Sequence, residues 1–533
     1  LVSTIDHLIS ATEGVRGGKQ LPAMLRLLTS DLVLDEPDDF DIADLHAVCR
    51  LMNWAGMLGT RVLLSSATLP PGLIQALFAA YLAGRKMWQA SCGINGRPVN
   101  ICCAWFDEKD ADATQIYDGP GFRDAHAKFV ARRAVMLAEK ERLHFGRVAS
   151  VSSASGAIQD VTESVAQTVH TQMLKLHQAH RQRHESGKTV SLGLVRFANI
   201  NPLVAVTKAL IVIPSPEDVC IHYCVYHSRH PLAVRSDIEK RLDRAFTRHN
   251  ELDFWNNEDI ADAIHNRPES HHLFVVLGTS VIEVGRDWDA DWGIIEPSSM
   301  RSIIQFAGRI QRHRRNVPTS ENLVILRSNI KSLQKKAPAF CKPGFETKEH
   351  LLNSHDICEL IPIADYRTIN ALPRILSANN ANKLAELEHS RLSAELMSSK
   401  SKHVVAAQWW RAPLSWNGWM QRQTPFRYSP LPEAVFFLHM DDEESEARFY
   451  SRTGDNERKA QGNFRREEVR CASGVACWGE MDYQHVLLNL ADKQSCEIAN
   501  VGEKFAEVRV PVSEEDAVDD WRYHPWLGVF RNM

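Results

Sequence analysis

Short apolar runs alternate with helix-like segments in two stretches of the chain, and this alternation constrains the fold most strongly. In the first stretch, residues 31–34 and 60–64 are apolar runs, and residues 42–58 between them carry apolar side chains at helical spacing. The second stretch starts near residue 189 and contains four runs that we expect to be strands, at 190–197, 220–226, 273–278 and 292–296. Such strand–helix–strand repeats form doubly wound parallel sheets, whose ligands bind at the carboxyl ends of the strands. We therefore expect an α/β protein with two lobes of this kind.

An acidic turn follows the first apolar run and carries the most informative chemistry. Asp35, Glu36, Pro37 and Asp38 come directly after Leu34. At the carboxyl end of a strand, Asp35 can hold Mg²⁺, usually through water, and Glu36 can polarise an attacking water. Phosphoryl transfer needs this division because its transition state is stabilised mainly by positioning and charge. An isolated acidic turn is more often a solvated loop, so its meaning depends on the other motifs.

Two of those motifs also stand at expected strand ends. Ser66-Ala67-Thr68 follows the run at 60–64, and its hydroxyl groups are expected to bond the acidic turn. Gly278-Thr279-Ser280 ends the run at 273–278 and precedes a polar loop with Glu283, Gly285, Asp287 and Asp289.

A third motif is basic. If residues 305–312 form a helix, Gln305, Gly308, Arg309 and Arg312 share one of its faces. The two guanidinium groups could then reach a γ-phosphate and act as arginine fingers. The alternative is an ordinary basic surface helix, which the following residues 313–315 (His-Arg-Arg) would also fit.

The order and spacing of these motifs are typical of a superfamily-2 helicase. They predict two RecA-like lobes, the first truncated at its N-terminus, and a C-terminal accessory domain. Catalysis is expected from Asp35, Glu36, Gln305, Arg309 and Arg312, with Asp35 also the Mg²⁺ ligand. Contacts to ATP are expected from Asp38, Ser66, Thr68, Gly285, Asp287 and Gly308.

We expect four segments along the chain. They are the remainder of the first lobe at 1–118, a helical connection at 119–188, the second lobe at 189–334 and the accessory domain at 335–533, whose fold the sequence does not predict. The Ser/Ala/Gly-rich stretch 149–156 is typical of a linker. The basic tract that begins at Lys175 is interpreted as the solvated face of a connecting helix, with a DNA-facing stripe as the alternative.

The overall composition excludes little. A net charge of −4 neither supports nor excludes nucleic-acid binding, and no apolar run approaches the roughly 20 residues that span a bilayer. The 11 cysteines lack a disulfide framework, which favours a reducing cytoplasm. Cys220, His222, Cys224 and His227 are a possible zinc set, but their alternation favours a buried strand.

The motif strings resemble the CRISPR-associated helicase–nuclease of type I systems, subtype I-F. The resemblance rests on residues 3–7 (Ser-Thr-Ile-Asp-His), 32–39, 64–68, 193–199, 226–229 (Tyr-His-Ser-Arg), 278–289 and 305–312. It implies an ATP-dependent motor that moves 3′ to 5′ on single-stranded DNA, recruited by the guide-RNA surveillance complex. It also implies DNA contacts at Thr4, Asp6, His227, Ser228, Arg229 and Thr279. The whole protein would add an adaptation-type domain and a metal-dependent HD nuclease, and the CRISPR integrase is a further expected partner.

Two features depart from that family pattern. Residues 14–19 (Gly-Val-Arg-Gly-Gly-Lys) are one residue short of a phosphate-binding loop, and Gln20 replaces the required Ser or Thr. The single His-Asp pair, His355-Asp356, follows the motor and has no partner histidines at nuclease spacing, so we interpret it as incidental. We expect the phosphate loop and the nuclease to precede Leu1, so that this chain alone neither hydrolyses ATP efficiently nor cuts DNA. The alternatives are another superfamily-2 DNA or RNA helicase, or a non-catalytic docking protein derived from one.

Overall fold

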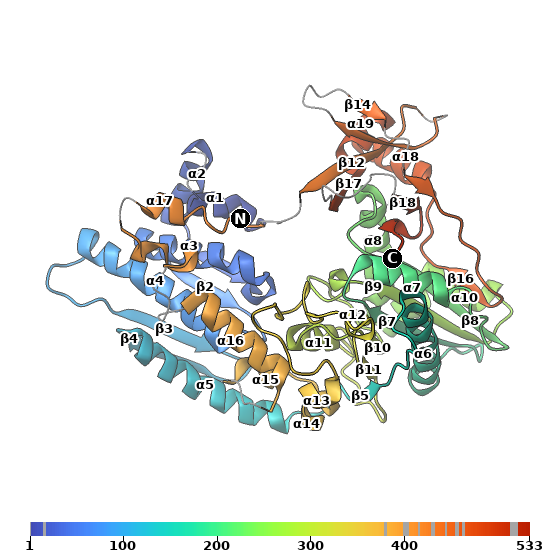
Figure 1. Ribbon diagram of the computed structural model, residues 1–533, viewed down its shortest axis with the longest axis horizontal. Helices are drawn as coiled ribbons and strands as arrows, with labels where there is room; N and C mark the ends of the chain where they lie inside the picture. The colour runs from blue at the N-terminus through green and yellow to red at the C-terminus, as the bar shows by residue number, and fades with distance from the viewer. Residues whose placement is uncertain are drawn as a thin grey trace. The chain divides into compact units, whose positions relative to one another are not determined.

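The computed structural model divides the chain into two compact units (Figure 1). The first unit comprises Leu1–Lys140 and Asn370–Ser429, and the second comprises Glu141–Ile369 and Pro430–Met533. The structure describes residues 2–13, 17–377, 381–397, 404–413, 416–427, 432–442, 445–452, 458–460, 464–511 and 521–533. Half of the candidate phosphate loop at 14–19, namely residues 14–16, therefore lies outside the described residues. The expected boundaries at 118, 188 and 334 stay predictions, but the expected accessory region is shared between the two units.

The first unit is built around the two strands that the sequence predicts. Strands β1 (Leu32–Asp35) and β2 (Val62–Ser65) are parallel, and helix α3 (Ile42–Leu58) connects them. Helix α4 (Pro71–Cys92) packs against α3. The two helices approach so closely that a Cβ at Gly84 would lie 2.1 Å from the Asn53 carbonyl oxygen. Glycine is therefore required at this crossing.

The other elements of the first unit come from both ends of the sequence. The segment after residue 370 returns to pack on the N-terminal part, as the contacts of α16 with α4 and of η3 with α3 demonstrate. The remaining elements are α1 (Asp6–Glu13), α2 (Gly17–Thr29), η1 (Pro37–Asp39), β3 (Ile101–Phe106), β4 (Ala111–Ile116), α5 (Gly119–Glu139), α15 (Leu372–Ile375), α16 (Lys383–Met397), η3 (Ala406–Arg411) and α17 (Asn417–Met420).

A large parallel sheet forms the centre of the second unit. Its strand order is β16-β8-β9-β7-β10-β11-β5, and a short strand, β6, pairs with β7 in the antiparallel sense. The four runs expected to be strands are β7 (Thr189–Arg196), β8 (Val219–Tyr226), β9 (His271–Gly278) and β10 (Trp292–Ile295). The other members are β5 (Gly146–Ala149), β6 (Gln182–Arg183), β11 (Leu323–Leu326) and β16 (Val475–Cys477). The structure thus confirms the predicted α/β class with a doubly wound parallel sheet.

Helices cover both faces of this sheet. Helices α6 (Ile158–His180) and α7 (Ile200–Leu210) bury residues such as Val165 and Leu203 against one face, in a continuous apolar core. On the other face, Phe274 of β9 contacts Trp478, which in turn contacts Phe246 of helix α8 (Leu232–Phe246). Because both faces are buried, the strands are nearly all apolar, as is typical of parallel sheets.

One secondary-structure prediction was wrong in this region. The connection expected to be helical over 119–188 contains a strand: its first helix ends at Glu139, and residues 146–149 form the edge strand β5, which pairs with β11. Four residues carry too little periodicity to separate strand from helix, so the pairing partner decides the structure. Between β5 and α6, residues 150–157 form neither helix nor strand, as expected of a linker.

The C-terminal part of the second unit adds two small sheets. An antiparallel sheet has the order β14-β13-β12-β17, and a second has the order β15-β18-β19. These elements are β12 (Glu433–His439), β13 (Arg448–Arg452), β14 (Arg458–Ala460), β15 (Arg465–Arg466), β17 (Glu507–Pro511), β18 (Trp521–His524) and β19 (Gly528–Arg531), with helices α18 (Tyr483–Gln494) and α19 (Ile498–Phe505). No helix in the described part of the chain is both long and apolar enough to cross a membrane.

Candidate functional site

The acidic turn lies at the carboxyl end of β1, where the sequence places it. Asp35 is the last residue of β1 and is opposite Ser65 of β2, and the Glu36 amide donates to the Ser65 carbonyl at 2.7 Å. Glu36 adopts φ 45° and ψ 55°, in the left-handed region that non-glycine residues seldom occupy. Such a conformation costs on the order of 1–3 kcal/mol and is most often retained at functional sites. The strain turns the chain sharply into η1.

Asp38 is the point where the acidic turn meets the Ser-Ala-Thr motif. The Ser66 hydroxyl donates to Asp38 Oδ1 at 2.6 Å, and the Thr68 hydroxyl donates to Asp38 Oδ2 at 2.7 Å. The Thr68 amide donates to Ser66 Oγ at 3.0 Å, which fixes the motif itself. The structure therefore contains the hydrogen bonds that the sequence predicted between these two strand ends.

Arg374 completes this network, and sequence reasoning missed it. Its Nη1 donates to Asp38 Oδ2 at 2.7 Å and to the Thr68 hydroxyl at 2.8 Å. Its Nε and Nη2 donate to Glu388 Oε1 at 3.0 and 2.7 Å. Arg374 and Asp38 are 336 residues apart in the sequence, and no local pattern marks Arg374. A single buried guanidinium thus joins α15 and α16 to the ends of both strands.

The charges of this network determine its protonation. Burial opposes ionisation of Asp38, but Arg374 and the hydrogen bonds from Ser66 and Thr68 outweigh it and hold the pKa of Asp38 below its usual value. Burial also opposes the charge on Arg374, but Glu388 and Asp38 outweigh it and raise the pKa of Arg374. Asp38 and Arg374 are therefore both charged.

Glu36 has the opposite environment. Burial, followed by the nearby carboxylates of Asp38 and Asp39, raises the pKa of Glu36 to about 7. A carboxylate with a pKa near 7 exchanges a proton readily at neutral pH, which is what a general base requires. Asp35, the expected Mg²⁺ ligand, is exposed beside it.

The buried network makes a strong prediction for stability. Replacing Arg374 by Met removes the cation that pairs with the carboxylates of Asp38 and Glu388. Because the three side chains are at most 1% exposed, water cannot replace it. Removing one partner of a buried ion pair costs about 3–5 kcal/mol. We expect the first thermal unfolding transition of R374M, followed by circular dichroism, to move down by several degrees.

Arg61→Met provides the matched control for this substitution. Arg61 forms a two-pronged ion pair with Asp31 in the same unit, but its side chain is 86% exposed. Its removal is expected to leave the transition unchanged. An R374M variant as stable as R61M would contradict the structural role assigned to Arg374.

In the second unit, the basic motif departs from the predicted helix. Helix α11 (Met300–Ala307) ends before Gly308, which is its C-cap, so Arg309 and Arg312 lie beyond the helix rather than on one of its faces. Arg309 Nε donates to the Glu283 carbonyl at 2.8 Å, and a second nitrogen donates to the Arg286 carbonyl. Both bonds tie the basic segment to the loop that follows β9.

Arg312 has an ionic partner in the same loop. Its Nε donates to Asp287 Oδ1 at 2.7 Å, and His313 Nε2 lies 3.1 Å from the same oxygen. These contacts, His313 first and then Arg312, lower the pKa of Asp287 to about 2. The two arginines and Asp287 are therefore brought together as one cluster, whereas Gln305 remains on α11 and is half-buried.

The residues expected to contact DNA differ in their exposure. Thr4 and Asp6 are exposed at the start of α1, and Ser228 is exposed after β8. His227 and Thr279 are buried, and His227 Nε2 is 2.8 Å from the Leu527 carbonyl oxygen. His227 thus anchors the turn to the C-terminal hairpin β18–β19, and the contacts of His227 and Thr279 with DNA stay predictions.

Arg229 lines a cavity of about 380 Å³ together with Ser228, Arg235 and Arg509. Its guanidinium donates to Asn201 Oδ1 at 3.0 Å and lies 5.0 Å from the centre of the Trp521 ring. Burial lowers the pKa of Arg229 to about 10, so it remains a cation at neutral pH. Glu433 and Glu507 also line the cavity, and Arg509 Nε lies 2.5 Å from Glu507 Oε1, so the cavity carries charges of both signs beside the exposed hydroxyl of Ser228.

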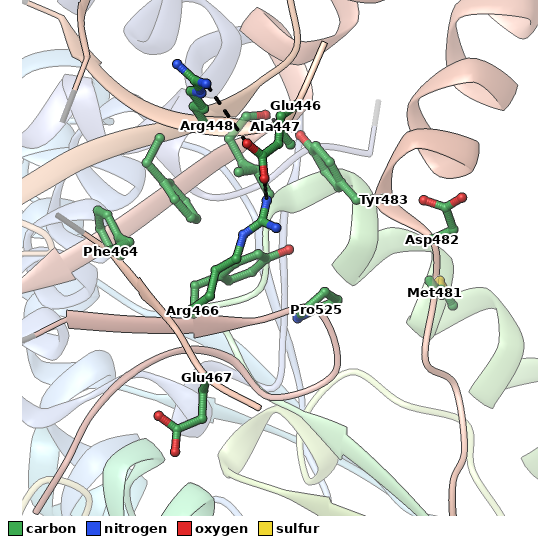
Figure 2. Close-up of a pocket in the computed structure, with 13 residues that line it drawn as sticks. Glu446, Ala447, Arg448, Phe464, Arg466, Glu467, Met481, Asp482, Tyr483 and Pro525 are labelled. Atoms are coloured by element: carbon green, nitrogen blue, oxygen red, sulfur yellow. Dashed lines mark hydrogen bonds and ion pairs between the residues drawn. The ribbon is translucent and has the colours of Figure 1, made fainter. Parts of the chain in front are cut away.

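A larger cavity, of about 500 Å³, lies in the C-terminal part of the second unit (Figure 2). Its charged groups bond to one another: Glu446 lies 2.6 Å from Arg466 and 4.0 Å from Arg448, as the dashed lines in Figure 2 indicate. No residue of the predicted motifs lines this cavity, so we assign it no part in the candidate site.

The possible zinc set folds as the buried strand that its alternation predicts. Cys220, His222 and Cys224 lie on β8 and are buried, whereas His227 follows the strand. His222 Nε2 is 3.3 Å from Nδ1 of His272, which lies on β9, and burial lowers the pKa of His222 to about 3. The ligand atoms of Cys220, His222 and His272 lie within 4.8 Å of one another, so the buried cluster includes His272 of β9 rather than Cys224 or His227.

His355 and Asp356 have structural partners as well. His355 Nε2 lies 2.9 Å from Glu346 Oε1, and Asp356 caps helix α13 (Ile357–Leu360) while bonding Arg327. This pair therefore holds a local loop.

Comparisons with known proteins agree with the motifs. The family model "CRISPR-associated nuclease/helicase Cas3, C-terminal" matches residues 189–315, and "CRISPR-associated Cas3 subtype I-F/YPEST-like, C-terminal domain" matches residues 433–531. The curated protein "CRISPR-associated nuclease/helicase Cas3 subtype I-F/YPEST" of Pectobacterium atrosepticum is 49% identical over 99% of this chain. The protein of the same name from Pseudomonas aeruginosa is 41% identical over 99% of this chain. This chain spans about half the length of both relatives, 49% of each.

Solved structures resemble the chain more distantly. A crystal structure of T. fusca Cas3 with AMPPNP matches 99% of this chain and 53% of its own length, at 14% identity and a TM-score of 0.49. A structure described as a CRISPR RNA-guided surveillance complex before nicking matches 98% of this chain and 59% of its own length, at 13% identity and a TM-score of 0.46. Similarity at this level carries no information about function. From the relatives and the two family models together, the chain belongs to the CRISPR-associated nuclease/helicase Cas3 family, subtype I-F/YPEST.

Proposed function

We propose that this chain forms most of the ATP-driven, superfamily-2 DNA helicase of a CRISPR interference effector. The observation that carries the proposal is the acidic turn: Glu36 is strained and has a pKa raised to about 7, and Asp38 beside it is fixed by Ser66, Thr68 and Arg374. Strain and a base tuned to neutral pH, together at a strand end, are typical of a catalytic position.

The residues of the turn have distinct roles in this proposal. Carboxylate oxygens suit Mg²⁺, so Asp35 would hold the ion through water, while Glu36 accepts a proton from the water that attacks the γ-phosphate of ATP. Asp38 orients Glu36 and carries the contact to Ser66 and Thr68. Gln305, Arg309 and Arg312 would stabilise the charge that develops on the phosphate, with Gly285, Asp287 and Gly308 in the supporting loops.

Single-stranded DNA is the proposed track, and movement 3′ to 5′ the proposed direction. Thr4, Asp6, His227, Ser228, Arg229 and Thr279 are the proposed contacts. Ser228 and Arg229 line one cavity, where an exposed hydroxyl and a guanidinium could meet a phosphate together. We further propose that a type I-F surveillance complex recruits the whole protein, that a metal-dependent HD nuclease elsewhere in that protein degrades the unwound strand, and that the CRISPR integrase is another partner. Because it would act on DNA inside the cell, we propose that the protein is located in the cytoplasm.

Because the sequence contains no complete phosphate-binding loop, the 533-residue chain by itself should turn over ATP poorly. Efficient DNA-stimulated hydrolysis by this polypeptide alone would contradict that part of the proposal.

Replacing Glu36 by Gln tests the motor against the docking alternative. In the full-length protein, E36Q keeps the shape of the side chain but cannot accept the proton, and general-base catalysis contributes about 10²–10⁴-fold. We expect DNA-stimulated ATP hydrolysis, measured by phosphate release, to fall by at least about 10²-fold, and strand displacement to stop. A protein that only docks would keep its cellular interference activity with this substitution.

The pKa of Glu36 also predicts a pH dependence. Glu36 must be ionised to act as a base, so the rate should rise with pH up to a value near 7 and level off above it. Bound Mg²⁺ favours the carboxylate and would move this edge to lower pH, never to higher. We expect the pH profile of kcat at saturating Mg²⁺ and ATP to have one ascending limb with a midpoint at or below about 7. A limb that rises only above pH 8 would exclude Glu36 as the base.

The nearest alternative motor acts on RNA. Strand-displacement assays with matched DNA and RNA duplexes distinguish the two, because the proposal requires the full-length protein to unwind DNA. Activity restricted to RNA duplexes would favour an RNA helicase.

A further inference from the structure

One segment of the chain has an unusual charge pattern. Residues 396–432 contain five Lys or Arg and no Asp or Glu, although acidic residues outnumber Lys and Arg in the chain as a whole, 66 to 62. Within this segment lies α17, which carries Trp416 at its N-cap and Trp419 in its only turn. A basic segment that contains aromatic residues is the composition that proteins use to bind a polyanion with planar bases.

The two tryptophans face solvent. Trp416 is 55% exposed and Trp419 is 54% exposed, and their rings meet edge to face with centroids 5.6 Å apart. The next residue, Met420, is instead buried in a cluster with Trp409. Tryptophan is highly buried on average, so a pair left this open on an ordered turn indicates a binding surface.

The segment is firmly attached to the start of the first unit. Arg50 donates to the Thr424 carbonyl at 2.8 Å, and the Phe426 amide donates to Glu13 Oε1 at 2.6 Å. Arg427 donates through its amide to Asp44 Oδ1 at 2.6 Å and through its guanidinium to Asp6 Oδ2 at 3.0 Å. The segment that carries the tryptophans is therefore bonded to both ends of α1, which begins at the proposed DNA contact Asp6.

A cation accompanies the aromatic pair. The Arg422 amide donates to the Trp419 carbonyl at 3.0 Å, and its side chain is exposed. Among the described residues, the structure gives the Arg422 guanidinium no ion pair. Arg422 therefore offers an exposed cation three residues after Trp419, within reach of the backbone of a strand bound at this turn.

We propose that Trp416 and Trp419 form a stacking platform for the bases of single-stranded DNA, with Arg422 contacting the backbone. The proposal deepens the proposed DNA-motor function and rests on it. Stacking on an indole tolerates any base, because every base presents a π-face, and a translocating motor needs this tolerance. The absence of carboxylates over residues 396–432 favours a nucleic acid over a protein partner, since a phosphate backbone would be repelled by them.

Paired binding measurements on the full-length protein test the platform. Fluorescence anisotropy would give Kd values for an oligothymidylate and for an abasic strand of the same length and the same number of phosphates, at fixed salt. The variants are W416A/W419A, the conservative W416F/W419F, and F106A as a control. Phe106 is an aromatic residue of the same unit, 69% exposed on β3.

The platform predicts a specific pattern of affinities. W416A/W419A should bind the oligothymidylate at least about five-fold more weakly than the wild type, because stacking on aromatic side chains contributes at least that factor per base. Its affinity for the abasic strand should be unchanged, F106A should behave as the wild type, and W416F/W419F should recover part of the loss. Thermal unfolding that matches the wild type would show that the alanine variant is folded.

Other outcomes overturn the proposal in distinguishable ways. If the wild type binds neither strand, the proposed DNA-motor function itself fails. If W416A/W419A binds each strand as tightly as the wild type does, the stacking platform is refuted, whereas the proposed DNA-motor function is not. If that variant instead loses only recruitment by the surveillance complex, the tryptophans are a protein-docking surface. An equal loss on both strands would mean that the substitutions disturb the fold or the backbone contacts rather than stacking.

Discussion

Arg374 bonds Asp38, Thr68 and Glu388 at once, and the geometry of the acidic turn depends on this one buried cation. Burying a carboxylate without a partner is costly, so Asp38 can remain ionised inside the unit only while Arg374 is present. Asp38 in turn holds Ser66 and Thr68, which brings the ends of β1 and β2 to a common point. The strained backbone of Glu36 lies between these fixed points. A segment more than 300 residues away thereby shapes the turn that carries the proposed base.

The same network separates the properties of neighbouring carboxylates. Asp38 is compensated by a full positive charge and is ionised, whereas burial, followed by the like charges of Asp38 and Asp39, raises the pKa of Glu36 to about 7. Two acids that are close in sequence thus receive different chemical roles from their surroundings. In the second unit, Arg312 is held by Asp287, and Arg309 by two backbone carbonyls. The proposed role of Arg312 at a phosphate would therefore require its ion pair with Asp287 to open.

Much of this arrangement could be predicted from the sequence because it follows from strand ends. The acidic turn and the Ser66-Ala67-Thr68 motif follow the neighbouring parallel strands β1 and β2, which bring them to one edge of their sheet. The loop after β9 likewise stands at a strand end, in the sheet of the second unit. Arg374 could not be predicted, since nothing local to it indicates a contact with Asp38. The end of α11 at Ala307 was missed because the face shared by Gln305 and Arg309 outweighed the helix-ending tendency of Gly308. The burial of His227 was hidden for a similar reason: its partner is the carbonyl of Leu527, at the far end of the chain.

A double-mutant cycle on Asp38 and Arg374 tests most directly whether the buried cation positions the acidic turn. DNA-stimulated kcat/KM for ATP would be measured in the full-length protein for the wild type, D38N, R374M and the double variant. Because the two residues are held to act as one unit, the double variant should lose no more than about two- to three-fold beyond the more damaging single substitution. Losses that multiply in the double variant would show that Arg374 and Asp38 act independently, and would contradict the claim that the buried cation positions the acidic turn.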